Sequence, residues 1–450
     1  MVDTKNELTT QGIFKLSWPI FISLIAQSLI GVVDTAFIAR VGEVELGGTA
    51  MGSLVYFSIY TIGWGLASGT QIMISHRYGS GKHSEIGLVL GQSVKLLLFA
   101  AFFVMLIALS FGPLLFNSLL SSPSVASSAV DYWQYRSFGF IFAFISSTLR
   151  SFFVGISRTK VLTLNSIVMS IVNITLDYLL IFGHCNFPEL GVKGAAISSV
   201  VAELSSVVFY LLYITFKVDR KSYCISLSKV FIYDKAISKK LFSLSYYLML
   251  QAFVSQSVWT VFFFMLESLG ERELAVASIT RQLYVLIFMP VNSYGTSVRT
   301  TVGHIVGAGH LDELMPYLKK AVSLSLVTML FLFAFLQIAP EIPLRIFTDD
   351  ASLIKDSTTT LRILSYAGLI ASVGNMFFNA VGSTGNTKRV FQIELINTVF
   401  YLVYGALMVY VVKASVAVCF SVEFFYFLSI ALMSYSYIRK IATSGIEPNN

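Results

Sequence analysis

Charge is scarce in this sequence. Only 12% of its 450 residues are charged, whereas 56% are hydrophobic and the mean hydropathy is +0.76. A water-soluble protein needs more surface charge than this, so the composition excludes a soluble globular protein and predicts that lipid surrounds most of the chain. Backbone polar groups in lipid must be paired internally, which leaves helices and closed barrels. Apolar runs of this length predict helices, because barrel strands are shorter segments of alternating hydrophobicity.

Cysteine and nucleotide-binding motifs are scarce as well. The three cysteines, Cys185, Cys224 and Cys419, are too scattered to suggest a disulfide framework or a metal site. The sequence contains no GxxxxGK[ST] motif, so we expect no nucleotide and no cofactor, and energy must come from an ion gradient or a partner. The net charge of +7 does not indicate nucleic acid, because the basic residues lie between apolar runs.

The apolar runs predict an all-α membrane protein with twelve transmembrane helices. The runs lie near residues 14–39, 46–75, 87–111, 130–154, 161–183, 192–217, 238–267, 273–303, 317–338, 357–381, 389–412 and 415–438. Basic residues cluster in every second connection, as at Arg77 and Lys82, and the intervening connections are acidic or mixed. By the positive-inside rule both termini are cytoplasmic, and we expect a multi-pass protein of the inner (cytoplasmic) membrane.

An internal repeat organises the twelve helices. The turn HRYGSGKH begins at His76 and HIVGAGH begins at His304, 228 residues later, and the same offset separates Thr159 from Thr387. We therefore predict two six-helix lobes with pseudo-two-fold symmetry around a central cleft, which suits alternating access. The predicted domains are an N-terminal lobe (1–216), a basic cytoplasmic linker (217–240) and a C-terminal lobe (241–450).

Two acidic residues stand out because each lies in an apolar run. Asp34 lies six residues before Arg40, and Asp177 lies six residues before Gly183, each at the outer end of its helix. At roughly 1.5 Å per residue, both lie about 9 Å inside the membrane boundary and could share one site. An aspartate in lipid costs roughly 2.5–3.5 kcal/mol and usually has a function, although neighbouring hydroxyls could also satisfy it in a purely structural role.

The repeat makes this acidic pair asymmetric. The residues 228 positions after Asp34 and Asp177 are Phe262 and Gly405, so the second lobe has no counterpart. Two carboxylates in a poorly hydrated site resist being ionised together and are expected to titrate as one unit. Asn173, one turn before Asp177, adds an amide oxygen, which suits hard cations. The pattern predicts a proton or Na⁺ coupling site at Asp34, Asn173 and Asp177, without deciding between the two ions.

Three further residues of the N-terminal lobe are candidates. Pro19 would kink the first helix, or would simply be tolerated in its first turn. Glu203 lies near the middle of the sixth helix, where it could extend a proton path or bind a cationic substrate, and Gln27 is assigned to the same group.

The C-terminal lobe carries a different set of charges. Arg281 lies inside an apolar run, and Glu394 and Glu423 lie in the last two helices. An arginine in a membrane needs a partner, so we predict an ion pair from Arg281 to Glu394 or Glu423 that stiffens this lobe.

Several segments resemble the multidrug and toxic compound extrusion (MATE) transporters of the MOP flippase superfamily. They are VVDTAFIARVGEVELGGTAMG, GSGKH, ISRTK, NITLDYLLIFG and GVKGAAISS in the first half, and HIVGAGH and GSTGNTK in the second. The sequence is similar to the DinF-type branch, which keeps its essential acids in the N-terminal lobe. The further acids of the NorM-type branch are replaced by Ser255, Gln256 and Asn375.

This resemblance implies roles for individual residues. It places Asp34, Asp177 and Asn173 at the cation or proton site and makes Pro19 the proline about which the first helix bends. It assigns the hydroxyl ligand of the sixth helix to Ser199. It also implies efflux of organic compounds, typically cations, driven by inward H⁺ or Na⁺.

The sequence thus favours a multidrug efflux antiporter that works by alternating access, and not an enzyme. Its expected partners are small organic substrates, cationic or amphipathic, and the lipid bilayer, with no nucleic acid and no nucleotide, and the chain is expected to be a monomer. The alternative is a flippase for a lipid-linked or amphipathic substrate. A second alternative is a membrane receptor or scaffold that transports nothing.

Overall fold

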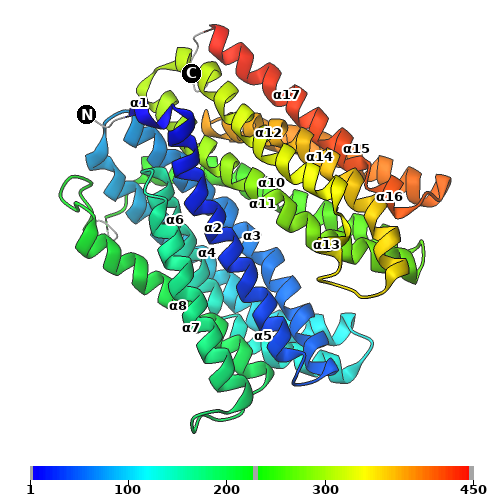
Figure 1. Cartoon of the computed structure of the whole chain (residues 1–450). Coiled ribbons are helices and arrows are strands. Elements are labelled where there is room, and N and C mark those ends of the chain that lie inside the picture. Colours follow the sequence, from blue (N-terminus) through cyan, green and yellow to red (C-terminus); the bar gives the residue numbers. More distant parts are fainter. Residues whose placement is uncertain (1–3, 227–231, 445–450) are drawn as a thin grey trace. The chain divides into compact units, whose positions relative to one another are not determined.

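The computed structural model describes residues 4–226 and 232–444, and within these ranges the ordered elements are helices with no strand (Figure 1). Eleven of the helices are long and apolar enough to cross a membrane, and counting one bent helix pair as a single span gives twelve. The predicted all-α fold with twelve spans is therefore confirmed.

The first half contains six spans in chain order. They are α2 (Thr10–Ile38), α3 (Glu43–Gly79), α4 (His83–Leu119), the bent pair α5 (Pro123–Arg136) and α6 (Gly139–Gly155), α7 (Lys160–Phe182) and α8 (Val192–Lys217). A short helix, α1 (Thr4–Glu7), precedes them.

The second half repeats this order. Its spans are α10 (Lys235–Glu267), α11 (Glu271–Ala308), η1 (Leu311–Glu313) with α12 (Leu314–Ile338), α14 (Ala351–Ser383), α15 (Thr387–Ala406) with the π-helix η2 (Leu407–Val412), and α16 (Val416–Cys419) with α17 (Val422–Ser444). The short helix α13 (Glu341–Leu344) lies between α12 and α14. Most spans extend several residues beyond their predicted ends, because apolar residues mark the lipid-facing part of a helix rather than its full length.

The repeat is visible in the helix boundaries. The offset of 228 residues separates the starts of three pairs of elements: Glu43 and Glu271, His83 and Leu311, Pro123 and Ala351. The duplication that two turn motifs predicted therefore extends to the helices themselves.

The fourth span differs from the prediction of one helix near residues 130–154. α5 ends at Arg136, α6 begins at Gly139, and the two helices are bent by 51°. Ser137 Oγ donates to the carbonyl of Trp133 at 2.7 Å, and such serine bonds, like serine and glycine placed close together, bend helices. The corresponding helix of the second half, α14, runs unbroken from Ala351 to Ser383.

The chain divides into two compact units. The N-terminal unit comprises Ile22–Tyr78 and Lys82–Met249, and the C-terminal unit comprises Met1–Phe21, Gly79–Gly81 and Leu250–Asn450. Helix α2 therefore passes from one unit to the other between Phe21 and Ile22, two residues after Pro19. The predicted domain boundary at residues 217–240 stays a prediction, and Lys229 within it lies outside the described residues.

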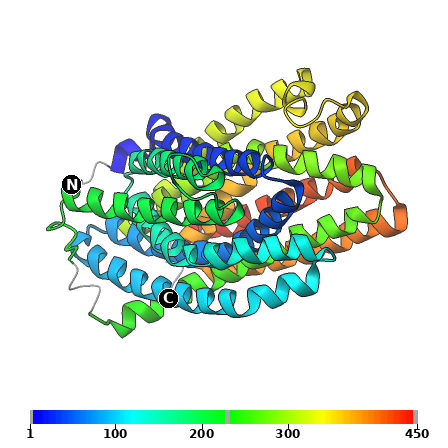
Figure 2. The same cartoon turned by 90° about the horizontal axis from the view of Figure 1, so that it is seen from below.

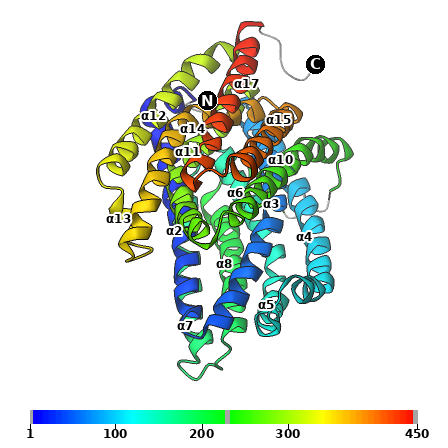
Figure 3. The same cartoon turned by 90° about the vertical axis from the view of Figure 1, so that its right-hand side faces the viewer.

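Each unit has its own packing centre. In the N-terminal unit α8 packs against α5, α6 and α7, and Figures 1 and 3 label these four helices in two views. In the C-terminal unit α14 packs against α11, α12, α15 and α17. The view in Figure 2 shows the helices of each unit running alongside one another. Within lipid such packing is stabilised mainly by van der Waals contact, because lipid tails are as apolar as the side chains they replace.

Candidate coupling site

Helices α2 and α7 bring Asp34 and Asp177 together in the N-terminal unit. The two carboxyl groups interact with each other, and Asp34 also interacts with Asn173. Asp177 and Asn173 are fully buried. The same two helices are also joined closer to the start of α7, where Ser166 of α7 and Ser23 of α2 share a hydrogen bond of 2.7 Å.

The end of α7 is fixed by a glycine. Gly183 caps the helix in the left-handed conformation, with φ of 69°, which costs other residues roughly 1–2 kcal/mol. A Cβ there would also lie 2.9 Å from the Cβ of Glu189. Glycine therefore ends α7 about one and a half turns after Asp177, at roughly 3.6 residues per turn.

The hydroxyl that meets the acidic pair belongs to Ser198 and not to Ser199. Ser198 Oγ of α8 donates to Asp177 Oδ1 and is fully buried, whereas Ser199 is only partly buried. Successive residues of a helix point about 100° apart, since a turn holds about 3.6 residues, so a shift of one residue along α8 changes the face. The assignment of Ser199 is corrected accordingly.

Several polar atoms of this site lack a hydrogen bond of normal geometry. They are Asp34 Oδ1, Asp177 Oδ2 and both amide atoms of Asn173. Buried polar atoms are nearly always satisfied in proteins, so such a group calls for an explanation. A carboxylate pair with amide and hydroxyl oxygens fits a proton or a hard monovalent cation such as Na⁺, which prefers oxygen ligands.

The second half contains an internal control for this arrangement. Phe262 and Gly405 occupy the positions 228 residues after Asp34 and Asp177. They also face each other, since a Cβ on Gly405 would lie 3.3 Å from the Phe262 ring. Phe262 is fully buried in an apolar core with Tyr401 and Phe420. The same pair of positions is thus acidic in one half and apolar in the other, and a six-helix lobe folds without the acids.

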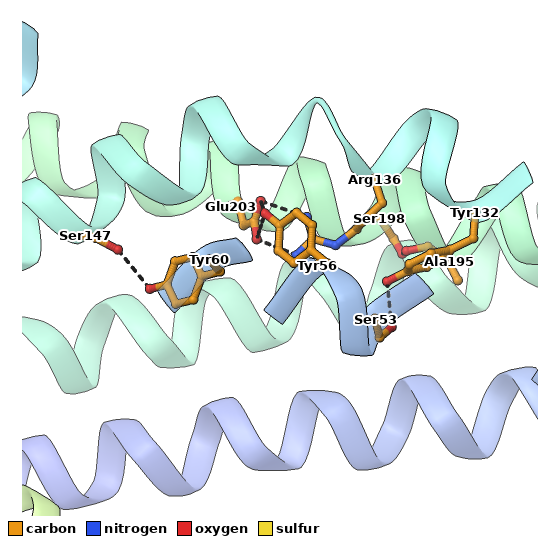
Figure 4. Close-up of polar contacts among 9 residues, drawn as sticks. All are labelled: Ser53, Tyr56, Tyr60, Tyr132, Arg136, Ser147, Ala195, Ser198 and Glu203. Carbon is orange, nitrogen blue, oxygen red and sulfur yellow. Dashed lines mark hydrogen bonds and ion pairs between the residues drawn. The ribbon is translucent and has the colours of Figure 1, made fainter. Parts of the chain in front are cut away.

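A buried ion pair lies in the same unit. Arg136, at the end of α5, donates to both oxygens of Glu203 of α8, at 2.6 Å and 3.0 Å (Figure 4). Tyr56 of α3 donates to the same carboxylate at 3.1 Å and 3.2 Å. The Arg136 guanidinium also stacks on the Tyr56 ring, 3.6 Å from its centroid. The role predicted for Glu203, in a proton path or in binding a cationic substrate, stays a prediction. In the structure its carboxylate binds Arg136.

Arg136 was not predicted as a site residue, although the sequence carries a signal. Arg136 lies inside the predicted fourth span, where an arginine needs a partner as much as Arg281 does. Its pairing depends on the glycine at position 139, because a Cβ there would lie 2.1 Å from Arg136 Nη1 and 2.6 Å from Glu203 Oε2. Glycine at this position makes room for the ion pair.

The predicted ion pair of the C-terminal lobe does not form. Within the described residues Arg281 makes no salt bridge and lies 5.2 Å from the ring centroid of Phe263. Glu423 accepts instead from Tyr401 at 2.8 Å, Tyr284 at 3.2 Å and Trp259 at 3.4 Å. Neutral donors thus satisfy this carboxylate in place of an arginine.

Glu394 is satisfied in the same way. It accepts from Tyr426 at 2.9 Å and from Gln251 at 3.5 Å, and only 1% of it is exposed. Both buried acids of the C-terminal unit are therefore held by neutral aromatic or amide groups of neighbouring helices.

Gln27 and Pro19 lie on α2 and take no part in the Glu203 cluster. Gln27 donates to Ser23 at 3.1 Å, so it extends the serine contact between α2 and α7. Pro19 lies inside α2, nine residues after its start. Across the described residues there is no group of three or more His, Cys, Asp and Glu side chains that could hold a metal, and the acidic pair with its amide remains the arrangement that suits a single small cation.

Comparison with known proteins identifies a family. The sequence profile of the MatE family matches residues 19–179 and 248–407, which is more than half of the chain. A "Probable multidrug resistance protein NorM" of Thermotoga maritima is 26% identical over 382 residues, covering 83% of this chain and 80% of the relative. A protein of the same name in Geobacillus kaustophilus is 30% identical over 189 residues, 42% of each chain.

A solved structure has the same fold. It is described as the outward-facing conformation of a multidrug resistance MATE family transporter of the MOP superfamily. It aligns with a TM-score of 0.90 at 18% identity and covers 99% of both chains.

Proposed function

The chain belongs to the MatE family of multidrug and toxic compound extrusion transporters, and we propose that it exports organic cations or amphipathic compounds in exchange for H⁺ or Na⁺. It is a multi-pass membrane transporter and not an enzyme. The proposal includes the inner membrane as its location, with both termini cytoplasmic, and a monomer as the transporting unit.

One observation carries the coupling proposal: Asp34 and Asp177 interact with each other beside a fully buried Asn173, whose amide atoms make no hydrogen bond of normal geometry. Two neighbouring carboxylates repel each other when both are ionised, so binding of one proton or one Na⁺ relieves that repulsion. The bound ion therefore favours the conformation in which the two acids are close.

Coupling then follows from differential binding. An ion moves a two-state equilibrium only by the difference between its affinities for the two states, and a full switch needs a ratio of about 10⁴. We assign to Pro19 the point at which α2 bends, because the division between the units falls two residues beyond it. Substrate would leave when the ion-loaded pair draws α2 and α7 together.

The DinF-type assignment is part of this proposal. Its support is the placement of the acidic pair in the N-terminal unit, while the corresponding positions of the C-terminal unit are Phe262 and Gly405. A lipid flippase would need a positive charge free to bind an anionic headgroup. The buried Arg136 does not favour this alternative, because Glu203 already neutralises it at 2.6 Å.

The test is ion-linked transport in proteoliposomes, with ethidium as the probe and with pH and Na⁺ gradients imposed separately. Asp34→Asn and Asp177→Asn should each abolish exchange while the protein still elutes as a folded species in detergent. Asp131→Asn is the control, since this aspartate forms an exposed ion pair with Lys193 at 3.4 Å. Full exchange by both site variants, or lipid transport without ion-linked ethidium flux, would refute the proposal.

A further inference from the structure

The ion pair of Arg136 and Glu203 has no part in the exchange described so far, yet its charge reaches the acidic pair. Arg136 attracts Asp34 electrostatically, and Tyr132, one turn before Arg136, interacts with both of them. Tyr132 in turn accepts a hydrogen bond from Ser53 at 3.1 Å. Figure 4 shows Ser198 and Glu203, both of α8, near Tyr132 and Arg136 of the neighbouring helix α5. The two clusters are therefore electrostatic neighbours.

The groups around Arg136 come from four helices. Glu203 approaches from α8, Tyr56 from α3, Tyr132 from its own helix α5, and Asp34 from α2. Two carboxylates, those of Asp34 and Glu203, thus face one fixed positive charge. Arg136 is only 8% exposed, so solvent screens its charge little.

A fixed positive charge beside a cation site lowers the affinity of that site, and the anion that neutralises the charge restores the affinity. We propose that Arg136, held by Glu203 and Tyr56, is a positioning residue of the coupling site whose charge sets how tightly Asp34 and Asp177 hold their proton or Na⁺. This inference rests on the proposed function.

The repeat argues against a role in folding alone. The residues 228 positions after Arg136, Gly139 and Glu203 are Leu364, Ala367 and Ala431, all of which are buried or nearly so. The second half therefore builds the same six-helix arrangement with three apolar residues in these places. The ion pair occurs only in the half that also carries the two aspartates.

The test measures the half-saturating concentration of the driving ion in proteoliposomes, with ethidium as the transported probe. Glu203→Gln leaves the Arg136 charge without its neutralising partner, so half-saturation should require about tenfold more H⁺ or Na⁺. This is the order expected for one uncompensated unit charge near the site at an effective dielectric constant of about 20. Asp131→Asn removes a carboxylate from an exposed ion pair between the same helices, α5 and α8, and should leave half-saturation unchanged.

A second set of variants separates charge from geometry. Arg136→Lys keeps the charge but loses the two-pronged contact, so its half-saturation should stay near that of the wild type. The double variant Arg136→Gln with Glu203→Gln removes both charges and should return half-saturation to the wild-type value or below it. A purely structural pair would lower the maximal rate of every variant without moving half-saturation.

The outcomes distinguish the inference from the function on which it rests. If Asp34→Asn and Asp177→Asn abolish exchange but Glu203→Gln leaves half-saturation unchanged, the role of Arg136 is refuted and the coupling site stands. If the two aspartate variants still exchange ions, the proposed function itself is refuted.

Discussion

Replacing Gly139 by alanine tests the buried ion pair through a single methyl group. The added Cβ would lie 2.1 Å from Arg136 Nη1, 2.6 Å from Glu203 Oε2 and 3.0 Å from the Tyr56 hydroxyl. Real Cβ atoms do not approach so closely, so the guanidinium, the carboxylate or both must leave these positions. Because both are largely buried, with side chains 10% and 13% exposed, water cannot replace the lost contacts.

The expected loss of stability can be bracketed from two sides. Overpacking a filled site costs about 1–3 kcal/mol, and breaking a buried ion pair by removing one partner costs about 3–5 kcal/mol. In Gly139→Ala both partners remain but lose their geometry, so we expect a loss of about 2–4 kcal/mol in the free energy of unfolding. The measurement is thermal unfolding in detergent, followed by intrinsic fluorescence.

Two controls make this prediction sharp. Gly31→Ala adds the same methyl group to α2 where nothing lies within 4 Å, so the unfolding temperature should change little. The triple variant Arg136→Leu, Gly139→Ala and Glu203→Ala should recover most of the lost stability. It copies the corresponding residues of the second half, which are Leu364, Ala367 and Ala431. If Gly139→Ala is as stable as the wild type, or if the triple variant is less stable than Gly139→Ala, the reasoning is wrong.

Three further predictions concern single side chains. Ser198→Ala should raise the half-saturating concentration of the driving ion, because Asp177 loses its hydroxyl donor. Ser199→Ala should have a smaller effect, and the reverse order would favour Ser199 as the hydroxyl of the site. Glu423→Leu leaves Tyr401, Tyr284 and Trp259 without an acceptor and should destabilise the protein by about 1–3 kcal/mol or more. Glu423→Gln keeps an acceptor and should lower the free energy of unfolding less in the same assay. Equal losses in the two variants would show that these hydrogen bonds do not contribute to stability. Hydrogen bonds from the Ser352 hydroxyl and from the backbone of Ser352 and Leu353 hold the pKa of Asp350 below its ordinary value, so its contribution to stability is present above the unfolded pKa of about 3.9 and is lost as pH falls through the folded pKa. Asp350→Ala should therefore lower the unfolding temperature at pH 7, and its difference from the wild type should shrink only as the pH falls below the unfolded pKa and through the lower folded pKa. A difference that persists unchanged in strong acid would contradict this.

The sequence predicted what depends on strong contrasts in polarity. A carboxylate in an apolar run is conspicuous, so Asp34 and Asp177 could be found, and their common depth suggested that they share a site. The structure brings the two together. The spans and the internal repeat were also predictable, because both follow from periodic hydropathy and from turn motifs that survive duplication.

The features that could not be predicted from the sequence depend on how each helix is rotated about its axis and on uncharged hydrogen-bond partners of buried acids. To choose Ser198 over Ser199, one must know which face of α8 points toward α7. The prediction of an ion pair for Arg281 was wrong because tyrosines and a tryptophan satisfy Glu423. Tyrosine is so common in this sequence that its presence does not indicate which residues donate to a buried acid. The pair of Arg136 and Glu203 lies beside a break at Ser137 that hydropathy did not predict, and it needs the small residue Gly139.

The central claim is that Asp34 and Asp177 together bind the coupling ion, and ion binding to the purified protein tests it most directly. Proton release and uptake, and binding of radioactive Na⁺, would be measured in detergent without substrate for the wild type and for the variants Asp34→Asn and Asp177→Asn. We predict one ion site in the wild type that is lost in each single variant, because the site needs both carboxylates. Undiminished ion binding in both variants would contradict the account.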